Sequence, residues 1–599
     1  MLKTALRGTG RCSGRGRNRW LVPAPEPDKT FVTPPILLFP LKKLLPALLL
    51  GSACFAAGAF IARPTAPDEI TVPLLRATQQ LFGLSFTDAQ LDSTRRNLTN
   101  YRDSYAALRA IPLPNSVAPS VVFDPRPLRL RQPAPLAAPI NPGKLPEAPK
   151  AKLPTNRDDL AFYTVRQLGE LLRTKQISSE ELTTFFLARL KKYDPRLHCV
   201  ITLTETLALQ QARQADQEIK AGKYRGPLHG IPYGAKDLYS AKGYKTTWGS
   251  VPYKDQILDE DAAVVERLRA AGAVLLAKLT LGELAQGDVW FGEKTRTPWD
   301  LTKGSSGSSA GSASAVAAGL LPFAMGTETL GSIISPSTAC GTTGLRPSYG
   351  RVSRAGAMAL SWTMDKAGPL ARSAEDCAIV LAALTAAGPD ARDAATLLAP
   401  NAFRYAFGTN LKKLRVGYLK AAFDQNYPTK ANDQASLEVL RKLGVELVPM
   451  ELPAIAPGAL RFVLTAEGAA AFDDLTRSGR DGQMVLQNRS AWPNTFRSSR
   501  FIPAVEYLQA QRVRSLLIEQ MDEKLKGFDA YIAPSFSANL VLTNLTGHPA
   551  IALPNGFTAA GLPSTITFMG QLYEEGTLLA LAKAYQDATD FDEKHPVLQ

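Results

Sequence analysis

The chain has 599 residues, of which 45% are hydrophobic and 21% charged, and this composition excludes a disordered protein because it supplies enough apolar material for a large core. The formal net charge is +15, but residues 1–43 alone contain nine Lys or Arg against two acidic residues. The rest of the sequence has no basic stripe interleaved with aromatic residues, so we expect no nucleic-acid partner. The five cysteines are scattered and none lies in a C-x-x-C pair, which argues against a disulfide framework and against a zinc site.

Residues 1–62 have the pattern of a basic tail followed by a targeting segment. Lys42 and Lys43 precede an uncharged apolar stretch over residues 44–62, whose far end is rich in small residues, as in a signal peptide. This stretch also comes close to the roughly twenty apolar residues of a membrane-spanning helix, and "LGSAC" weakly resembles a lipid-attachment motif ending at Cys54. We therefore expect an exported protein, periplasmic or secreted, with a membrane anchor at residues 44–62 or a lipid anchor as the alternative.

Two further segments precede the main body of the chain. Residues 63–111 contain "LLRATQQLFGLSF" and "LDSTRRNLTNYRDSYAAL", whose apolar residues recur at helical spacing and predict a small helical segment. Residues 112–157 contain about a dozen prolines and predict an extended, polyproline-like linker. A catalytic domain is therefore expected only beyond this linker.

Residues 158–590 alternate between helical patterns and short apolar runs. The stretch "VRQLGELLRTKQISSEELTTFFLARLKKYD" carries leucines at helical spacing, with Ser178 or Ser179 placed as an N-cap before Glu181. "GAVLLAKLT" and "RVGYL" have the composition of short buried strands. This alternation predicts an α/β catalytic domain.

Two glycine- and serine-rich runs, "KGSSGSSAGSASAVAAG" and "GTETLGSIISPS", lie close together between residues 303 and 337. A flexible linker fits them poorly, because an Ala-rich helix former and an apolar turn follow the first run. A phosphate-binding loop is not indicated, because neither G-x-x-x-x-G-K-[ST] nor G-x-G-x-x-G occurs in these runs. A serine hydrolase elbow, G-x-S-x-G, is present with Ser309 as nucleophile and His548 as candidate base, but the preceding "EKTRTPWDLTK" does not predict the strand that this elbow requires.

Several ordered motifs resemble those of the amidase signature family, and the form "ET-x-GSI" is most similar to its peptide-amidase branch. The motifs that carry the resemblance are "GPLHGIPYGAKD", "AKLTLGELA", "TPWD", "GSSAGSASAVAAG", "GTETLGSIISP", "CGTTGLRPSYGRVSRAG", "DKAGPLARSAEDCA" and "TNLTGHPAIALPNGF". The resemblance covers most of residues 158–590. It implies an amidase signature fold, in which a mixed central β-sheet is sandwiched between α-helices.

The resemblance also implies a catalytic triad of Ser332 as nucleophile, Ser308 as the cis-peptide serine and Lys236 as the base. Such a lysine must be neutral, yet a free lysine is neutral in only about 0.04% of molecules at pH 7. Burial among uncharged hydroxyls lowers a lysine pKa, and a Gly/Ser-rich loop supplies these surroundings without a carboxylate. The expected oxyanion donors are the backbone N–H groups of Thr329, Leu330, Gly331 and Ser332, and the expected supporting residues are Ser309 and Asp237.

The expected function is hydrolysis of a linear carboxamide, from a small molecule or a peptide, to a carboxylate and ammonia or an amine, with no metal and no cofactor. Leucine at 330 and isoleucine at 334 depart from the commonest family form, which has glycine and arginine there; the missing arginine weakens the case for small anionic substrates. The alternatives are a non-catalytic envelope binding protein on an amidase scaffold and a glutamyl-tRNA amidotransferase A-type subunit.

Four other residues within these motifs are expected to be structural. His229 is expected to support the turn before the lysine, and Cys340 to be a small packed thiol. Asp365 and Arg372 are expected to form a structural ion pair or to anchor loops.

Overall fold

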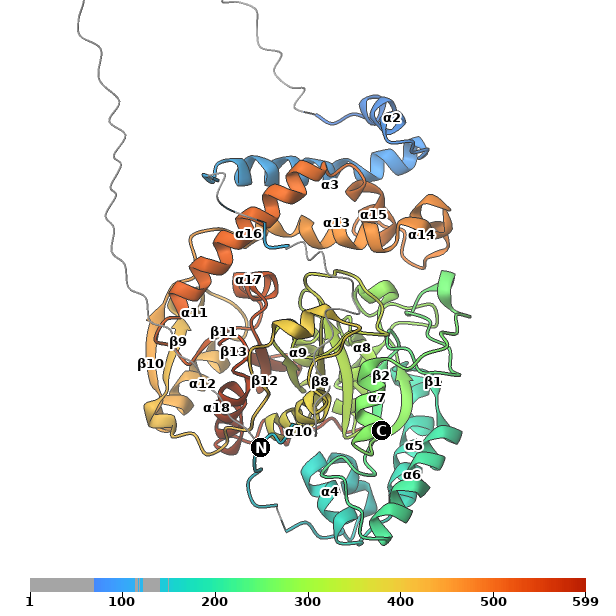
Figure 1. The fold of residues 1–599 in the computed structure, drawn as a ribbon, viewed down its shortest axis with the longest axis vertical. Coiled ribbons are helices and arrows are strands. Elements are labelled where there is room, and N and C mark those ends of the chain that lie inside the picture. Colours follow the sequence, from blue (N-terminus) through green and yellow to red (C-terminus); the bar gives the residue numbers. More distant parts are fainter. Residues whose placement is uncertain (1–68, 114–116, 118, 122–139, 149, 599) are drawn as a thin grey trace, which may run out of the picture. The chain divides into compact units, whose positions relative to one another are not determined.

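The computed structural model describes residues 69–113, 117, 119–121, 140–148 and 150–598 (Figure 1). The described residues from Ile70 onward form one compact unit. The expected basic tail and targeting segment, residues 1–62, lie outside the described residues. Among the described residues, no helix is both long enough and apolar enough to cross a membrane.

Within the described residues, eleven strands form one mixed sheet, which confirms the predicted fold class. In sheet order the strands are β1 (Val200–Leu203), β3 (Val274–Leu279), β2 (Pro232–Lys236), β6 (Phe323–Glu328), β8 (Lys366–Ala371), β7 (Thr343–Arg346), β12 (Ala550–Phe557), β13 (Pro563–Gly570), β11 (Ala530–Pro534), β9 (Arg415–Leu419) and β10 (Glu446–Met450). Strand β2 runs parallel to both β3 and β6, and β9 runs parallel to β10 and β11. The other pairings in the sheet are antiparallel.

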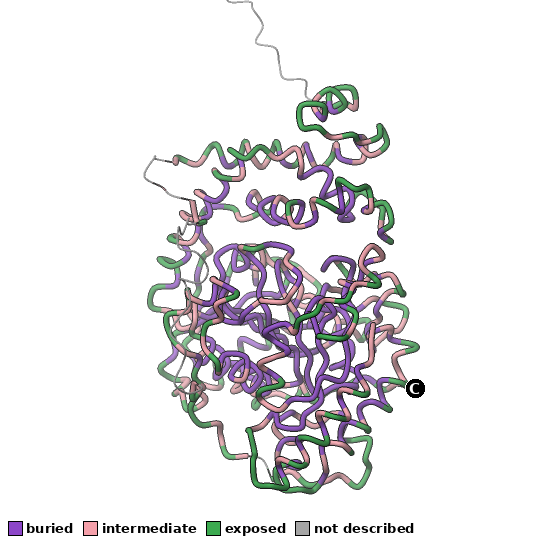
Figure 2. The backbone as a smooth tube through the Cα atoms, turned by 45° about the vertical axis from the view of Figure 1, so that its right-hand side comes forward, coloured by how far each residue is buried: buried purple, intermediate pink, exposed green. Residues whose placement is uncertain are grey.

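Helices cover the sheet and bury its apolar side chains (Figures 1 and 2). Those that contact its strands include α5 (Ser179–Leu197), α6 (Glu205–Lys220), α7 (Ala263–Ala270), α8 (Ala310–Ala317), α9 (Ile334–Cys340), α10 (Ala374–Thr385), α12 (Lys430–Lys442) and α18 (Glu575–Asp587). Helix α4 (Val165–Arg173) packs against α10. Every residue of α8 is buried, because alanine, glycine and serine let this helix approach the sheet closely.

The local signals in the sequence correspond to observed elements. Ser178 caps α5, and the Glu181 side chain completes a capping box by accepting from the Ser178 N–H at 2.8 Å. The predicted strands "GAVLLAKLT" and "RVGYL" are β3 and β9, and β3 is buried along its whole length. These predictions are confirmed.

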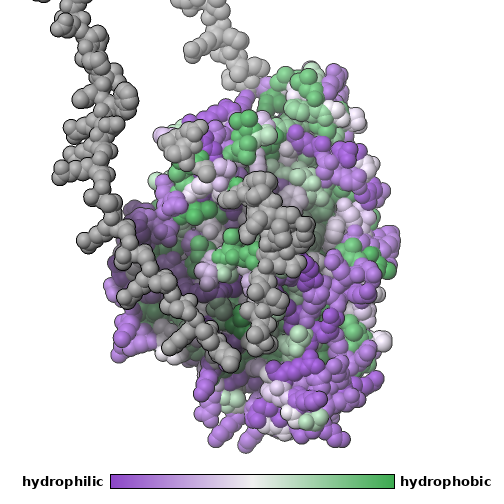
Figure 3. All heavy atoms as spheres, in the orientation of Figure 1, coloured by the Kyte–Doolittle hydropathy of each residue, from purple (hydrophilic) through white to green (hydrophobic). Residues whose placement is uncertain are grey.

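The segment before the proline-rich stretch forms α2 (Val72–Leu81) and α3 (Asp88–Arg109), as its periodicity predicted. Helix α3 packs against α15 (Trp492–Ser499) and α16 (Ala504–Leu525), and contacts α13 (Phe462–Ala471) through side chains. Its apolar face is buried there (Figure 2). Leu74 and Leu81 of α2, and Phe82 directly after it, are exposed apolar side chains. Hydrophobic residues gather at the surface near the top of the view in Figure 3.

The described parts of residues 112–156 form no helix or strand, and they contact the main body at both ends. The Ser120 N–H donates to the Gln511 carbonyl at 3.1 Å, and the Ile140 N–H donates to the Ala386 carbonyl at 2.7 Å. The chain between α3 and α4 therefore runs along the body of the protein at these points.

Candidate active site

The loop between β6 and α9 carries the serine expected as nucleophile, and a buried carboxylate fixes this loop. Glu328 accepts hydrogen bonds from the N–H groups of Ile333 and Ile334 at 2.9 and 3.0 Å. Its other oxygen accepts from Arg346 at 2.6 Å and from Asn544 at 2.8 Å. Burial opposes ionisation of this carboxyl, but the Arg346 charge and these hydrogen bonds lower the pKa of Glu328 to about 2.

The four backbone N–H groups expected as oxyanion donors lie on the loop that follows β6. Within the described residues, the N–H groups of Thr329, Leu330, Gly331 and Ser332 donate no hydrogen bond. Gly331 has φ of +90°, a conformation that favours glycine, so the chain can turn here with its donors unpaired. Backbone donors in folded proteins are nearly always paired, so a run of unpaired N–H groups beside a cavity can donate hydrogen bonds to an anionic oxygen bound there.

The expected base, Lys236, ends strand β2 and is completely buried. Its Nζ donates to Ser308 Oγ at 2.8 Å, to Thr327 Oγ1 at 2.9 Å and to Ser309 Oγ at 3.2 Å. The peptide bond between Gly307 and Ser308 is cis, at the position expected for the cis-peptide serine. The amine is thus surrounded by three neutral hydroxyl groups.

This environment determines the charge of the lysine. Burial lowers the pKa of Lys236 to about 7, and the carboxylates of Asp365 and Glu328 oppose the shift only partly. The neighbouring strand offers a contrast, because Lys278 is equally buried but forms an ion pair with Asp237 at 2.6 Å. Lys236 forms no ion pair within the described residues, so its ammonium form lacks this stabilisation.

Ser332 lies beside the serine-rich loop and is partly exposed to a cavity of about 490 Å³. The Ser309 N–H donates to the Ser332 carbonyl at 3.1 Å, which holds the two loops together. Within the described residues, no hydrogen bond joins the side chains of Ser332 and Ser308. Catalytic hydrogen bonds often tighten only when substrate is bound, so this geometry is compatible with a proton relay.

The two supporting residues differ in their positions. Ser309 contacts the Lys236 amine directly and also accepts from the Thr327 N–H at 3.1 Å. Asp237 faces away from this amine, accepting from Thr247 and pairing with Lys278. Asp237 therefore holds the loop that begins at Thr247 and does not contact the three hydroxyls.

The histidines do not form a hydrolase triad with Ser309. The His548 ring shares a hydrogen bond with Thr546 at 2.8 Å, and burial lowers the pKa of His548 to about 3. His229 accepts from the Arg225 N–H at 3.1 Å at the turn before β2, as expected for a structural residue.

The remaining structural expectations are met in part. Asp365 and Arg372 do not pair, because Asp365 accepts from Thr329 while Arg372 donates to backbone carbonyls near residue 592. Of the two expected roles, the ion pair does not form and each residue anchors a loop. Cys340 is a buried free thiol, as expected.

The sequence reasoning missed Thr327, Glu328, Arg346 and Asn544. A signal was present, because Glu328 ends an otherwise apolar strand, and a fully buried carboxylate requires a charged or hydrogen-bonding partner. The identity of these partners depends on tertiary contacts with β7 and with the helix α17 (Ala538–Thr546).

The cavity above Ser332 has walls from three regions of the chain. The loops around the serine contribute Ala285, Gln286, Gly287, Gly307, Thr329, Leu330 and Leu360. The helical region near α13 and α15 contributes Gly458, Arg461, Phe462, Leu464, Thr465, Trp492 and Thr495. Helix α3 contributes Asn97, Asn100, Tyr101 and Ser104. Among these described residues, Arg461 is the only one with a charged side chain.

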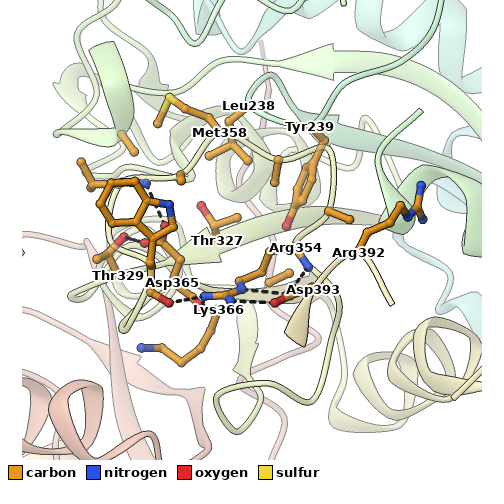
Figure 4. Close-up of a pocket in the computed structure, with 17 residues that line it drawn as sticks. Leu238, Tyr239, Thr327, Thr329, Arg354, Met358, Asp365, Lys366, Arg392 and Asp393 are labelled. Carbon is orange, nitrogen blue, oxygen red and sulfur yellow. Dashed lines mark hydrogen bonds and ion pairs between the residues drawn. The ribbon is translucent and has the colours of Figure 1, made fainter. Parts of the chain in front are cut away.

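A second cavity, of about 170 Å³, adjoins the first and shares Ala285, Thr329 and Leu360 with it. Figure 4 shows Thr327 among the residues that line it, and this threonine also bonds to the Lys236 amine. Two of its charged lining residues, Arg354 and Asp393, form an ion pair at 2.8 Å. The loop that follows β6 therefore lines both cavities through Thr329.

Comparison with known proteins gives a consistent set of similarities. A family model described as Amidase matches residues 181–541. The A-type subunit of the glutamyl-tRNA(Gln) amidotransferase from Methylococcus capsulatus is 36% identical over 480 residues, which cover 72% of this chain and 98% of that protein. The corresponding A-type subunit of Coxiella burnetii is 35% identical over 485 residues, covering 73% and 99%. The names of these curated relatives favour the amidotransferase alternative over the amidase expectation.

A solved structure, that of the peptide amidase from Stenotrophomonas maltophilia, has a TM-score of 0.62 at 31% identity, covering 71% of this chain and 96% of that one. This similarity agrees with the peptide-amidase form of the serine loop.

Proposed function

The chain belongs to the amidase family, as its motifs predicted, and on this premise we propose that it cleaves the C–N bond of a linear carboxamide through an acyl-enzyme on Ser332. The observation that carries the proposal is the Lys236 amine, which is buried among three hydroxyls and has a pKa of about 7. About half of such lysines are neutral at pH 7, against about 0.04% for a free lysine, which is a gain of roughly a thousandfold in available base.

In the proposed acylation step, Ser332 Oγ attacks the carboxamide carbon while its proton passes to Ser308 and the Ser308 proton passes to Lys236. The carbonyl oxygen becomes an oxyanion, which the unpaired N–H groups of residues 329–332 stabilise. The intermediate then collapses, the C–N bond breaks, and the proton held by Lys236 returns through Ser308 to the leaving nitrogen. Ammonia or an amine departs, and the acyl group remains as an ester on Ser332.

In deacylation, water takes the place of the departed nitrogen. Its proton passes along the same two groups to Lys236, its oxygen attacks the ester carbon, and the Ser332 oxygen leaves with the returned proton. The products are a carboxylic acid and the regenerated serine. The relay of one amine and one hydroxyl thus serves first as base and then as acid in each half-reaction.

A second candidate, an amidotransferase A-type subunit, shares the acylation step and differs in the fate of the nitrogen. The observation that favours it is the 36% identity to such a protein over 98% of that relative's length. In this case the released ammonia would pass to an acceptor held by another subunit, with glutamine as the amide donor. Ile334 stands where the commonest family form has an arginine, which argues against a small anionic donor.

Two measurements test these proposals. A fluorophosphonate probe should label Ser332, and Ser332→Ala should abolish both labelling and ammonia release. The isolated chain should release ammonia from a panel of neutral amides if it is a hydrolase. If ammonia were released only from glutamine, and only when partner subunits were present, the result would instead favour the amidotransferase. A chain that is neither labelled nor active would support a non-catalytic binding protein and overturn the main proposal.

We further propose that residues 44–62 direct export or anchor the chain, with residues 158–590 as the catalytic domain. The support is the lysine-flanked apolar stretch in the sequence. Cell fractionation, combined with determination of the mature N-terminus, tests this proposal. A chain found in the cytosol with residues 44–62 intact would contradict it.

A further inference from the structure

One wall of the cavity above Ser332 comes from α3, a helix that precedes the residues matched by the family model. The lining residues are Asn97, Asn100, Tyr101 and Ser104, at spacings of three, one and three, so they lie on one face of the helix. A helix outside the matched region therefore borders the reaction site directly.

A row of hydrogen bonds fixes the rotation of α3 about its axis. Tyr101 shares hydrogen bonds with Ser499 at 2.9 Å and with Thr465 at 3.1 Å. One turn earlier, Asn97 donates to Ser498 at 3.0 Å. These contacts join α3 to α13 and α15, the same helices that provide another wall of the cavity.

Aromatic packing strengthens this attachment. The Tyr105 ring meets the Phe462 ring edge to face at a centroid distance of 5.3 Å, and Phe462 itself lines the cavity. The face that α3 presents to the cavity is thus held by packing as well as by hydrogen bonds, so its side chains can act as fixed contacts for a ligand.

The two walls differ in chemistry. Phe462, Leu464 and Trp492 supply apolar surface, whereas the α3 side chains are polar and uncharged. The Asn100 side chain is exposed at the cavity and makes no hydrogen bond to another described residue, so both donors and the acceptor of its amide can bond to a ligand. An amide in this state matches a ligand group that also donates and accepts hydrogen bonds.

We propose that α3 is a specificity-determining element of the active site, and that Asn100 selects acyl groups that carry an internal amide over purely aliphatic ones. This inference rests on the proposed amide cleavage at Ser332. The apolar wall would hold the carbon chain of the acyl group, and Asn100 would bond to its internal amide.

The test compares two substrates of equal main-chain length, N-acetylglycinamide and pentanamide, which has methylenes in place of the internal amide. Asn100→Leu removes the hydrogen-bonding group at similar volume and should lower the ratio of kcat/KM for N-acetylglycinamide over pentanamide by about threefold to tenfold, the usual range for one neutral hydrogen bond. Ala106→Leu, an exposed position of α3 that does not line the cavity, is the matched control and should leave the ratio unchanged.

Protection of Ser332 against the fluorophosphonate probe by each amide gives a second readout that requires no turnover. The role of α3 would be overturned if both readouts gave an unchanged substrate ratio in Asn100→Leu, or if the ratio fell equally in Ala106→Leu. In either case, labelling of Ser332 in the parent protein would still support amide cleavage. Absence of labelling in the parent would overturn both proposals together.

Discussion

Lys236 and Lys278 lie on adjacent parallel strands and are both fully buried, yet only Lys278 is paired with a carboxylate. These two buried amines therefore differ in their electrostatic surroundings. Asp237 neutralises one amine, and three hydroxyls surround the other. The low pKa of Lys236 follows from this difference, because desolvation of its ammonium form has no ion pair to offset it.

The first prediction concerns the pH profile of amide hydrolysis. With a pKa of about 7, Lys236 should make kcat/KM rise tenfold per pH unit below about pH 6 and level off above about pH 8. Neutral amide substrates do not titrate in this range, so the midpoint reports the enzyme. Initial rates of ammonia release between pH 5 and pH 10 measure it. A profile that continued to rise to pH 10 would mean that the lysine keeps its ordinary pKa.

The second prediction is that Lys236→Met abolishes activity and stabilises the fold. The folded-state pKa of about 7 lies below the unfolded value near 10.4, so the unfolded chain binds more protons between these two pH values. Burying this amine therefore costs up to about 5 kcal/mol below pH 7, and this cost declines between pH 7 and pH 10.4. Methionine removes the titrating group at similar length.

Urea unfolding at pH 6 and at pH 9.5 checks this prediction. Lys236→Met should raise the free energy of unfolding at pH 6 by more than at pH 9.5, and Ser332→Ala serves as an inactive control that keeps the lysine. An equal effect of Lys236→Met at both pH values would contradict the proposed charge change.

The third prediction concerns Glu328, whose carboxylate joins the serine loop to Arg346. Glu328→Gln leaves a buried guanidinium without its counter-charge and should destabilise the protein by about 3 to 5 kcal/mol. It should also slow acylation, because the N–H groups of Ile333 and Ile334 lose a charged acceptor and the loop that carries Ser332 loosens.

The stability that the Glu328 carboxylate contributes should depend on pH in the acid range. Its folded-state pKa of about 2 lies below the unfolded value near 4.3, so Glu328 contributes stability above pH 4.3 that is lost as pH falls toward 2. Thermal unfolding between pH 3 and pH 6 should show a smaller pH dependence in Glu328→Gln than in the parent. A variant as stable as the parent at pH 6 would show that the ion pair does not hold the loop.

Local signals in the sequence were sufficient for the elements that local physics determines. The capping box of Ser178 and Glu181 and the apolar run of β3 depend only on neighbouring residues, and both were predicted. The hydroxyl environment of Lys236 came from the family motifs, which bring residues 307–309 and 326–337 to one site.

Contacts between distant polar residues could not be predicted in the same way. Tyr101 meets Ser499 across nearly 400 residues of chain; the helical periodicity places Tyr101 on the apolar face of its helix but does not identify Ser499 as its partner. The helix itself was predicted, but its position beside the cavity follows from packing against α13 and α15. The same holds for Glu328, whose partner Asn544 lies on α17.

The fourth prediction uses Arg461 to separate the two candidate functions. This guanidinium is exposed and is the only charged group among the described residues that line the cavity, so a substrate carboxylate would find its ion-pair partner there. If glutamine is the amide donor, Arg461→Gln should raise KM for glutamine by about tenfold, within the range for charge-assisted hydrogen bonds. If neutral amides are the substrates, their kcat/KM should change by less than about twofold, because an exposed charge contributes little to binding an uncharged group.

Steady-state assays of the two substrate classes, with Arg461→Lys as the variant that keeps the charge, distinguish these outcomes. If Arg461→Gln lost activity toward neutral amides and glutamine alike, Arg461 would support the cavity wall and would not bind a charged group of the substrate.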